Sequence, residues 1–393
     1  MKSKLVIGLL ALMIGFFGSP QVQALDQSFS LNSLESVSKI ESNNYHSCAI
    51  SSLGALCWGR SNFGQVGAGI GNFSTPTIIA PELNIVDFAL GYEHTCALAK
   101  QNKSSSVWCW GHNNYGQLGL GGTPSGSVEQ ITVPTLVNLK NVIDISAGSN
   151  FTCALANSGK VFCWGTQLWT NRKVSKTIPA WVKHKPTQVK NLKDVAKITT
   201  GGNSACALSN SGEVYCWGEN ILGQLGNSKK EFYAATTKVD IPKAKSVALS
   251  IGHGCALLRS GKVSCWGVNS GGEVGTDSYF EVNLWNVEKP RVVVGLTSVK
   301  SVFVGNGNTC AIIQSGKVKC FGWSGGIGLF GEEFEVLGKV PVPTLSFGGQ
   351  KGSQVSFGDN FACLLLQSKQ LECLGNPRIN YFGQLGNGEI SPM

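Results

Sequence analysis

Charged residues are scarce in this chain. They make up 14% of its 393 residues, against about 25% in an average soluble domain. So little charge excludes extensive disorder and long surface helices, which both need many charged residues. No segment after residue 24 is apolar enough to span a bilayer, which excludes a membrane-embedded mature chain. Glycine, by contrast, is abundant, with 50 residues and no collagen period, and indicates a turn-rich, largely β protein.

The first 24 residues have the features of a secretory signal peptide. Lys2 and Lys4 form a positive start, 13 apolar residues follow from Leu5 to Phe17, and Val22-Gln23-Ala24 is a small-residue cleavage site. The alternative, a membrane anchor, needs about 20 apolar residues. We therefore expect residues 1–24 to be removed and residues 25–393 to be secreted to the periplasm, the cell surface or the medium, where disulfides persist.

The 14 cysteines divide into seven pairs that recur along the chain. Five of the seven pairs are separated by 10 residues, and the first members recur every 48 to 57 residues. An even cysteine count in an exported chain indicates a disulfide framework. The predicted bonds are Cys48–Cys57, Cys96–Cys109, Cys153–Cys163, Cys206–Cys216, Cys255–Cys265, Cys310–Cys320 and Cys363–Cys373.

Each cysteine pair is predicted to join the two strands of one β-hairpin. In the third copy, Ala156 and Lys160 close a three-residue loop in which Gly159 takes the left-handed position. Counting outward, residues 153 and 163 form a non-hydrogen-bonded pair with Cα atoms about 4.5 Å apart, which a disulfide tolerates. Lys369 stands where the seventh copy needs this glycine, so strain or a different turn is expected there.

Two other uses of the cysteines fit poorly. The chain has no C-x2-C pair typical of zinc sites, so no metal site is expected. A disulfide-linked helical hairpin is disfavoured by the central Ser-Gly and the flanking Val, Phe, Tyr and Trp.

An apolar strand ending in Gly precedes each hairpin and a Pro-started strand follows it, as in TPTIIAPEL and KPRVVVGL. Four strands in about 50 residues make one propeller blade, so we predict an all-β, seven-bladed β-propeller with one disulfide per blade.

The two ends of the chain are predicted to complete one blade together. A Leu-x-x-Val junction joins successive blades, and it also occurs at Leu34 and Val37, before any complete blade. The seventh blade ends after GQLGNG without a fourth strand. The N-terminal strand, residues 28–34, is therefore expected to close the last blade, which makes residues 25–393 a single domain. The alternative is a flexible tail.

The repeat as a whole resembles that of the regulator of chromosome condensation family. The resemblance rests on H-[ST]-C-A-[LI], CWG and G-Q-[LV]-G, as in GYEHTCAL and CWGHNNYGQLG over residues 91–119, and it covers essentially 28–393. It implies a seven-bladed propeller. The secreted bacterial branch of the family, which includes a propeller that inhibits β-lactamases through aromatic-rich loops, is the more similar one. We expect no GTPase or chromatin partner for an exported chain.

The sequence contains no recognisable catalytic motif. It has no G-x-S-x-G, no phosphate-binding glycine motif and no metal-ligand cluster. His46, His94 and His253 occupy equivalent places in the repeat and are expected to be structural, whereas His112 and His184 have no nucleophile or paired carboxylate nearby in sequence. We expect no cofactor, no metal and no enzyme activity. The alternative is a secreted carbohydrate-active enzyme, a hydrolase or lyase, which would need two convergent carboxylates in a cleft.

A binding function is favoured because the loops between third and fourth strands emerge on one face and differ most between blades. Residues 169–193 hold seven basic residues and no acid, which suits an anionic partner, although a solvated loop fits equally well. The partner expected is a protein or an anionic envelope glycan, bound by a monomer. The candidate ligand-binding residues combine basic and aromatic side chains: Trp169, Arg172, Lys173, Trp181, Lys183, His184, Lys185, Tyr233, Tyr279, Trp285 and Trp323.

Overall fold

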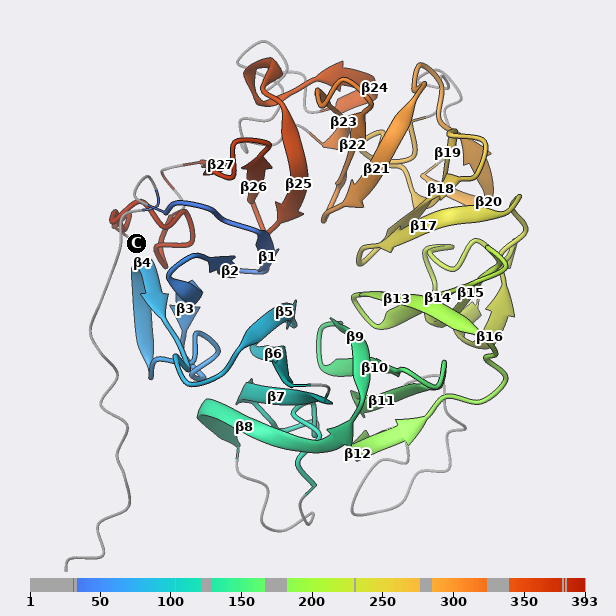
Figure 1. The fold of residues 1–393 in the computed structure, drawn as a ribbon. Coiled ribbons are helices and arrows are strands. Elements are labelled where there is room, and N and C mark those ends of the chain that lie inside the picture. Colours follow the sequence, from blue (N-terminus) through green and yellow to red (C-terminus); the bar gives the residue numbers. More distant parts are fainter. Residues whose placement is uncertain are drawn as a thin grey trace, which may run out of the picture.

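The computed structural model shows seven antiparallel sheets arranged around a central axis (Figure 1). It describes residues 31, 34–102, 104–121, 129–166, 182–229, 231–275, 285–323, 339–376, 378 and 380–392. Within those residues, six sheets have four strands and the seventh has three. The all-β, seven-bladed propeller with one disulfide per blade predicted from the repeat is confirmed. None of the described residues belongs to a helix with the length and apolarity that a membrane span requires.

The strands of each blade run in chain order from the axis outward. The first strands are β1 (Lys39–Asn43), β5 (Ile85–Leu90), β9 (Val142–Ala147), β13 (Val195–Gly201), β17 (Ala244–Leu249), β21 (Val299–Val304) and β25 (Gly352–Phe357). The second are β2 (His46–Ser51), β6 (His94–Gln101), β10 (Phe151–Ala156), β14 (Ser204–Ser209), β18 (His253–Leu258), β22 (Asn308–Ile313) and β26 (Phe361–Leu366). The third are β3 (Gly54–Ser61), β7 (Ser104–His112), β11 (Val161–Thr166), β15 (Val214–Asn220), β19 (Val263–Val268), β23 (Val318–Trp323) and β27 (Leu371–Gly375). The fourth are β4 (Gly71–Ile78), β8 (Gln130–Lys140), β12 (Val182–Gln188), β16 (Glu231–Lys238), β20 (Asn286–Val292) and β24 (Lys339–Leu345).

The disulfide-linked hairpins have the predicted register. Cys153 lies directly opposite Cys163, and all seven predicted bonds are present with Cα atoms 4.0–4.1 Å apart. The loop closes as expected, because Ala156 N donates to Lys160 O at 2.9 Å and Gly159 has φ +75°. In the seventh blade Lys369 adopts the same left-handed conformation, with φ +70°. The turn is therefore kept, and the non-glycine residue bears its strain.

The fourth strands begin earlier than the proline signals indicate. β4 starts at Gly71 and β8 at Gln130, several residues before the prolines of TPTIIAPEL and VPTLVNL. Each of these strands lies at the outer edge of its sheet, where one row of backbone N–H groups is left unpaired. Proline therefore fits inside an edge strand without removing a ladder hydrogen bond.

Neighbouring blades are joined by tryptophans that follow the second cysteine. These side chains are fully buried, as expected from their place in the repeat. Four of them donate the indole N–H to a backbone oxygen of the preceding blade at 2.8–3.1 Å: Trp58 to Gln384, Trp110 to Gln65, Trp164 to Gln117 and Trp266 to Gln224. The fifth, Trp217, has a buried indole N–H that finds no acceptor among the described residues. Trp217 belongs to blade 4, and the preceding blade 3 lacks in its sequence the G-Q-[LV]-G element whose backbone oxygen accepts this hydrogen bond elsewhere.

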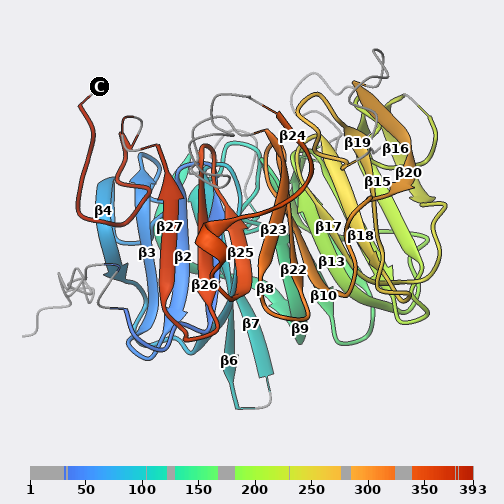
Figure 2. The ribbon, with the colours of Figure 1, turned by 90° about the horizontal axis from the view of Figure 1, so that it is seen from above.

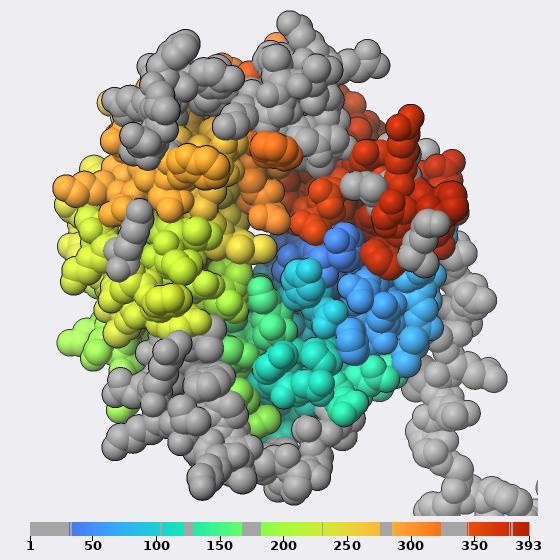
Figure 3. Space-filling model, turned by 180° about the vertical axis from the view of Figure 1, so that it is seen from behind, coloured from blue at the N-terminus to red at the C-terminus, as the bar shows by residue number. Residues whose placement is uncertain are grey.

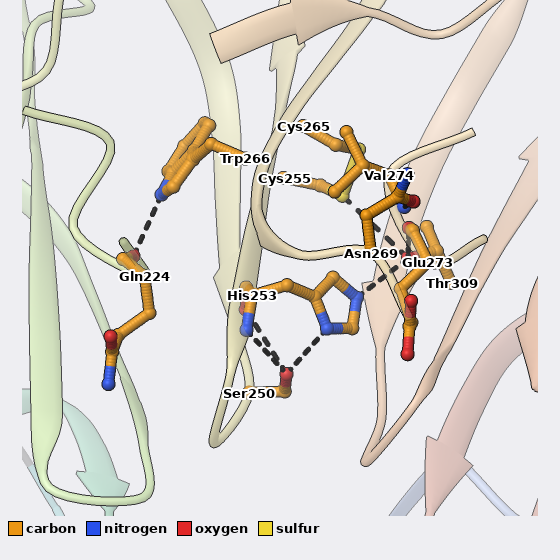
Figure 4. The surroundings of a disulfide bond; sticks show 10 residues. All are labelled: Gln224, Ser250, His253, Cys255, Cys265, Trp266, Asn269, Glu273, Val274 and Thr309. Carbon is orange, nitrogen blue, oxygen red and sulfur yellow. Dashed lines mark hydrogen bonds between the residues drawn. A yellow bond between two sulfur atoms is a disulfide. The ribbon is translucent and has the colours of Figure 1, made fainter. Parts of the chain in front are cut away.

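The repeated histidines extend this inter-blade lock, as Figure 4 shows for blade 5. The Nε2 atoms of His46, His94 and His253, the lock histidines, lie 2.8–3.0 Å from the hydroxyl of Thr95, Thr152 or Thr309 in the next blade. Each hydroxyl in turn donates to the backbone oxygen of Gln65, Gln117 or Glu273. Because the hydroxyl proton is used there, the histidine must donate from Nε2. The expectation that these histidines are structural is confirmed.

The ring closes between blades 7 and 1. Leu31, Leu34 and Val37 are buried in one cluster with residues of β26 and β27, and Val37 N donates to Lys369 O at 2.9 Å. The C-terminal segment crosses in the other direction, where Gly388 N donates to Ser74 O at 2.9 Å. Of the expected fourth strand of blade 7, residues 28–30, 32 and 33 lie outside the described residues, so that strand itself stays a prediction.

Candidate interaction face

The strand connections divide the propeller into two faces. Connections between the third and fourth strands emerge on one face, which we call the loop face, together with those between the first and second strands (Figure 2). The tight hairpins between second and third strands turn on the opposite face, the hairpin face, with the links between blades. Figure 3 views the loop face, where the described residues of blades 7, 1 and 2 appear in red, blue and teal.

The turn that carries G-Q-[LV]-G presents an aromatic residue on the loop face. In blades 1, 2 and 7 the residue before this element is Phe63, Tyr115 or Phe382. The following glutamine folds back, and its side-chain oxygen accepts a hydrogen bond from the aromatic residue's backbone N–H at 2.9–3.1 Å. The glutamine backbone oxygen is held by the inter-blade lock described above. The turn is therefore fixed at both its side chain and its backbone, and the aromatic residue is pre-positioned.

These side chains belong to a continuous row across blades 7, 1 and 2, which we call the aromatic arc. Phe382 packs on Tyr381 and on Tyr45, with ring centroids 6.5 and 5.0 Å apart. Further along, His112 lies between Phe63 and Tyr115, with centroids at 4.5 and 6.1 Å. Tyr115 is 44% exposed. Tyr92, which interacts electrostatically with Tyr45, is 40% exposed. The aromatic arc comprises Tyr45, Phe63, Tyr92, His112, Tyr115, Tyr381 and Phe382.

A charged chain of contacts bridges the two halves of the aromatic arc. The Arg60 guanidinium lies 5.3 Å above the Phe382 ring and 3.7 Å from the Glu93 carboxylate. The other Glu93 oxygen is 3.5 Å from Nδ1 of His112. Burial lowers the pKa of His112 below its usual value, and the Glu93 carboxylate opposes that change. His112 is therefore neutral at pH 7 and serves as a packing and hydrogen-bonding member of the arc.

The inner end of the aromatic arc reaches the mouth of the central channel. The Tyr45 hydroxyl donates to Asp359 Oδ2 at 3.1 Å, and the amide of Asn306 donates to the other oxygen at 3.2 Å. Burial, together with the neighbouring Asp359 carboxylate, raises the pKa of Tyr45 to about 12. Tyr45 is thus held in its neutral, hydrogen-bond-donating form.

The channel along the axis is a cavity of about 590 Å³ lined by the first strands of all blades. In every blade, one residue of the first strand faces the channel. It is the residue paired with the second-strand position that lies two after the first cysteine, as Lys39 is paired with Ile50. Blades 1 to 4 place charged side chains there and blades 5 to 7 place neutral ones. In blade order these residues are Lys39, Asp87, Asp144, Lys197, Ser246, Ser301 and Gln354.

Glu41 adds a third carboxylate to the charged side of the channel. Burial raises the pKa of Glu41 to about 7 and that of Asp144 to about 6. Lys39 forms ion pairs with both Glu41 and Asp87, and Asp144 accepts a hydrogen bond from Ile198 N at 2.9 Å. Two of the three carboxylates are therefore committed to one ammonium group. Across the described part of the chain, no group of three His, Cys, Asp or Glu side chains could hold a metal ion.

Five of the eleven candidate residues fall outside the described part of the chain. These are Trp169, Arg172, Lys173, Trp181 and Tyr279. The hypothesis that residues 169–193 bind an anionic partner therefore stays a prediction.

The other six candidates are spread over four blades. Lys183, His184 and Lys185 lie on β12, and His184 lies close to Gly116, beside Tyr115 of the aromatic arc. Tyr233 lies on β16 with its ring 6.5 Å from the exposed Phe232. Trp285 and Trp323 are 72% and 50% exposed and flank the third-to-fourth-strand connections of blades 5 and 6. All six lie next to the loop face, but only the β12 residues adjoin the aromatic arc.

The sequence interpretation missed the aromatic arc itself. Its signal was present, because three of the four G-Q-[LV]-G elements follow Phe or Tyr. We read that element only as a marker of the repeat. The binding residues were predicted in the long, variable loops instead, because basic and aromatic residues are concentrated there.

Comparison with known proteins identifies the repeat. Two sequence models of the regulator of chromosome condensation (RCC1) repeat match the chain, one at residues 54–98 and 104–155 and the other at 85–117, 195–224 and 244–273. The chain carries RCC1 repeats. These matches lie in blades 1 to 5, and the structure shows the same hairpin and disulfide in blades 6 and 7.

Curated relatives of this RCC1-repeat propeller include much larger proteins. The human E3 ubiquitin-protein ligase HERC2 is 31% identical over 208 residues, which is 50% of this chain and 4% of HERC2. The human probable E3 ubiquitin-protein ligase HERC6 is 31% identical over 196 residues, 49% of this chain and 18% of HERC6. The matches thus span a small fraction of these relatives, so their whole-protein activities are not carried over.

Solved structures agree with the fold. Human WBSCR16 superposes with a TM-score of 0.73 at 22% identity, covering 86% of this chain and 92% of that one. Yeast RCC1 (Prp20), solved bound to Kap60, gives a TM-score of 0.71 at 20% identity, with 95% and 88% covered. At this level of identity the likeness concerns the propeller fold.

Proposed function

We propose that this RCC1-repeat propeller is an exported, non-catalytic scaffold that binds a macromolecular partner, a protein or a cell-envelope glycan, through its loop face. The aromatic arc is the observation that supports the proposal. Interfaces concentrate their binding energy in a few aromatic and arginine anchors, and the arc supplies such side chains in one connected row. Its turns are fixed before binding, which reduces the entropy lost when a partner docks.

Export is supported by the signal-like N-terminus and the seven disulfides. Mass spectrometry of the protein from its native host should show a chain that starts at residue 25, found in the periplasm, on the surface or in the medium. A full-length chain in the cytoplasm with free thiols would contradict export. This outcome is independent of the binding test.

Binding by the aromatic arc can be tested with a matched pair of variants. We expect the triple variant Tyr92→Ala/Tyr115→Ala/Phe382→Ala to lose partners that the wild-type chain captures from envelope extracts. Phe232→Ala, which removes an aromatic side chain that is 68% exposed on blade 4, should keep them. Each captured partner is then purified and titrated by calorimetry, where removal of arc residues should weaken binding at least about tenfold. Equal affinities for the triple variant and the wild type would refute the assignment.

The basic loop of blade 3 is tested separately. Replacing Trp169, Trp181, Lys183 and Lys185 by Ala should weaken binding of an anionic partner, and increasingly so at low salt. A partner that depends on the arc but not on these four residues would confine the interface to blades 7, 1 and 2.

The enzyme alternative receives little support from the channel. A two-carboxylate glycosidase mechanism needs one carboxyl group as acid and one free carboxylate as base or nucleophile. Lys39 forms ion pairs with Glu41 and Asp87, and Asp359 accepts hydrogen bonds from Tyr45 and Asn306. Among the described carboxylates that line the channel, this leaves Asp144, which accepts a hydrogen bond from Ile198 N. Turnover of an envelope glycan by the wild type, abolished in Asp144→Asn, would overturn the non-catalytic assignment.

A further inference from the structure

We propose that the hairpin face binds an anionic phospholipid bilayer through a basic arc on blades 5, 6 and 7. The members lie in the hairpin turns and inter-blade links of these blades or at the start of β17 and β21, and all are exposed. The basic arc comprises Lys245, Arg259, Lys262, Lys300, Lys317, Lys351 and Lys369. It lies on the face opposite the aromatic arc, so this proposal does not depend on the proposed function.

Backbone hydrogen bonds hold each of these turns in a fixed place. Each hairpin turn is tied to the link that leads into its own blade: Arg259 N donates to Lys243 O at 2.8 Å and Gln367 N to Lys351 O at 3.0 Å. Adjacent blades are also joined, because Gly352 N donates to Gly316 O at 2.9 Å. The positive charges therefore lie at one end of the strands on a fixed frame, which presents them to a flat surface together.

Acidic side chains are few around the basic arc. Residues 241–245, 258–262, 293–300, 313–317, 346–351 and 366–370 contain no Asp or Glu. Two exposed acids lie in links on the same face: Asp240 in the link that leads into blade 5, and Glu35 next to the Lys369 turn. Two others are engaged: Glu213 pairs with Lys238 and Lys243, and Glu372 accepts a hydrogen bond from Gln350. The seven positive charges of the basic arc are thus offset only in part, by Asp240 beside blade 5 and Glu35 beside blade 7. Residues 25–393 as a whole carry a formal net charge of +7.

Lys317 and Lys351 repel each other, and an external anion would relieve that repulsion. They face each other across an antiparallel β-bridge between blades 6 and 7. Like charges placed directly opposite each other destabilise a sheet. An anionic headgroup between the two ammonium groups would reverse the sign of this interaction.

The composition of the basic arc favours a bilayer over a nucleic acid. Six of its seven members are lysines, which act as flexible point charges, whereas nucleic-acid sites favour the bidentate fork of arginine. The described residues of these turns hold no exposed aromatic side chain on which a base could stack. A planar array of lysines matches a planar array of lipid phosphates, and each lysine contributes to the attraction. A bilayer bound here would leave the loop face directed away from the membrane.

The test uses the mature chain and sucrose-loaded vesicles in a sedimentation assay. We expect the wild type to sediment with phosphatidylcholine vesicles that contain about one-third phosphatidylglycerol, and not with pure phosphatidylcholine. Lys300→Glu/Lys317→Glu/Lys351→Glu should reduce the partition coefficient at least about a hundredfold. Lys229→Glu/Lys289→Glu/Arg378→Glu, which changes net charge equally but outside the basic arc, should reduce it less than about tenfold. Thermal melts establish that both variants are folded.

Each remaining outcome bears on the proposal. Equal losses in the two triple variants would show that net charge, and not the basic arc, is responsible. Binding that survives about 1 M salt, where the Debye length is about 3 Å, would exclude an electrostatic interaction. Binding of a duplex DNA or a sulfated glycan without binding of the vesicles would overturn the bilayer as the occupant.

Discussion

The inter-blade lock predicts that removing the hydroxyl of Thr152 destabilises the ring. This hydroxyl is fully buried, accepts a hydrogen bond from His94 Nε2 at 2.9 Å and donates to Gln117 O at 3.0 Å. In Thr152→Ala the Nε2–H of His94 is left buried without an acceptor, which costs about 1–3 kcal/mol. The lost methyl group adds about 1 kcal/mol. We therefore expect the free energy of unfolding to fall by about 2–4 kcal/mol.

The molecule contains its own control for this variant. At the junction of blades 3 and 4 the equivalent residues are Phe151 and Ala205, so no polar pair exists there. The rings of Phe151 and His94 occupy the same place, against Gly148 and Gly91 respectively. The double variant His94→Phe/Thr152→Ala copies that apolar junction and leaves no donor unsatisfied, since Gln117 O still accepts from Trp164 at 2.8 Å. It should be more stable than Thr152→Ala alone by about 1 kcal/mol or more.

The measurement is equilibrium unfolding in guanidinium at pH 7 with the disulfides intact, followed by tryptophan fluorescence and far-ultraviolet circular dichroism. Coincident transitions by the two probes establish that one free energy describes the ring. A change of less than about 0.5 kcal/mol in Thr152→Ala, or a double variant whose loss equals the sum of the single losses, would refute the lock.

Three further predictions concern ring closure and pH. Leu34→Ala should lower the free energy of unfolding by about 2–5 kcal/mol, because this side chain is 2% exposed between blades 7 and 1. The control Leu53→Ala, at a side chain that is 44% exposed, should change it by less than about 0.5 kcal/mol. Equal melting temperatures for the two variants would show that the N-terminal segment does not close the ring. Burial lowers the pKa of the lock histidines to about 3 or 4. The stability they contribute is therefore present above pH 6.5 and is lost as the pH falls towards 3, by roughly 2 to 3 kcal/mol for each histidine at pH 4.5. Denaturant titrations from pH 7 to 4 should show a weaker pH dependence in His94→Phe than in the wild type. Burial raises the pKa of Glu41 to about 7, so its ionisation lowers the free energy of unfolding as the pH rises through 7. Glu41→Gln should therefore add roughly 1–2 kcal/mol to the free energy of unfolding at pH 8 and little below pH 4.5. A variant that is less stable than the wild type at pH 8 would contradict this sign.

The hairpins could be predicted because the information that specifies them is local. Cys153 and Cys163 lie on either side of a turn whose type is set by Gly159, so counting outward fixes their register without any knowledge of the rest of the chain. The starts of the fourth strands, which the proline signals were expected to mark, were not predicted correctly. An edge strand pairs on one side only, and its beginning depends on how far the third strand of the same blade extends beside it.

The candidate site was predicted less well, because its residues meet only in the closed ring. Phe382 and Tyr45 have ring centroids 5.0 Å apart although more than 300 residues separate them in sequence. The Glu93 contact between Arg60 and His112 likewise joins side chains from two blades. Sequence composition emphasised long loops rich in Trp and Lys, while the connected aromatic row arises from short turns that look like ordinary repeat elements.

The sequence by itself determined the repeat, the disulfide pairing and the propeller, because each blade is specified by short-range spacing that recurs seven times. The tertiary structure alone decided how the C-terminal segment contacts blade 1 and which side chains share a face. It placed the aromatic residues of blades 7, 1 and 2 on the loop face and the lysines of blades 5 to 7 on the hairpin face. The physical reason is that a closed ring brings equivalent positions of all blades to the same height and side, so isolated residues become continuous surfaces only after closure.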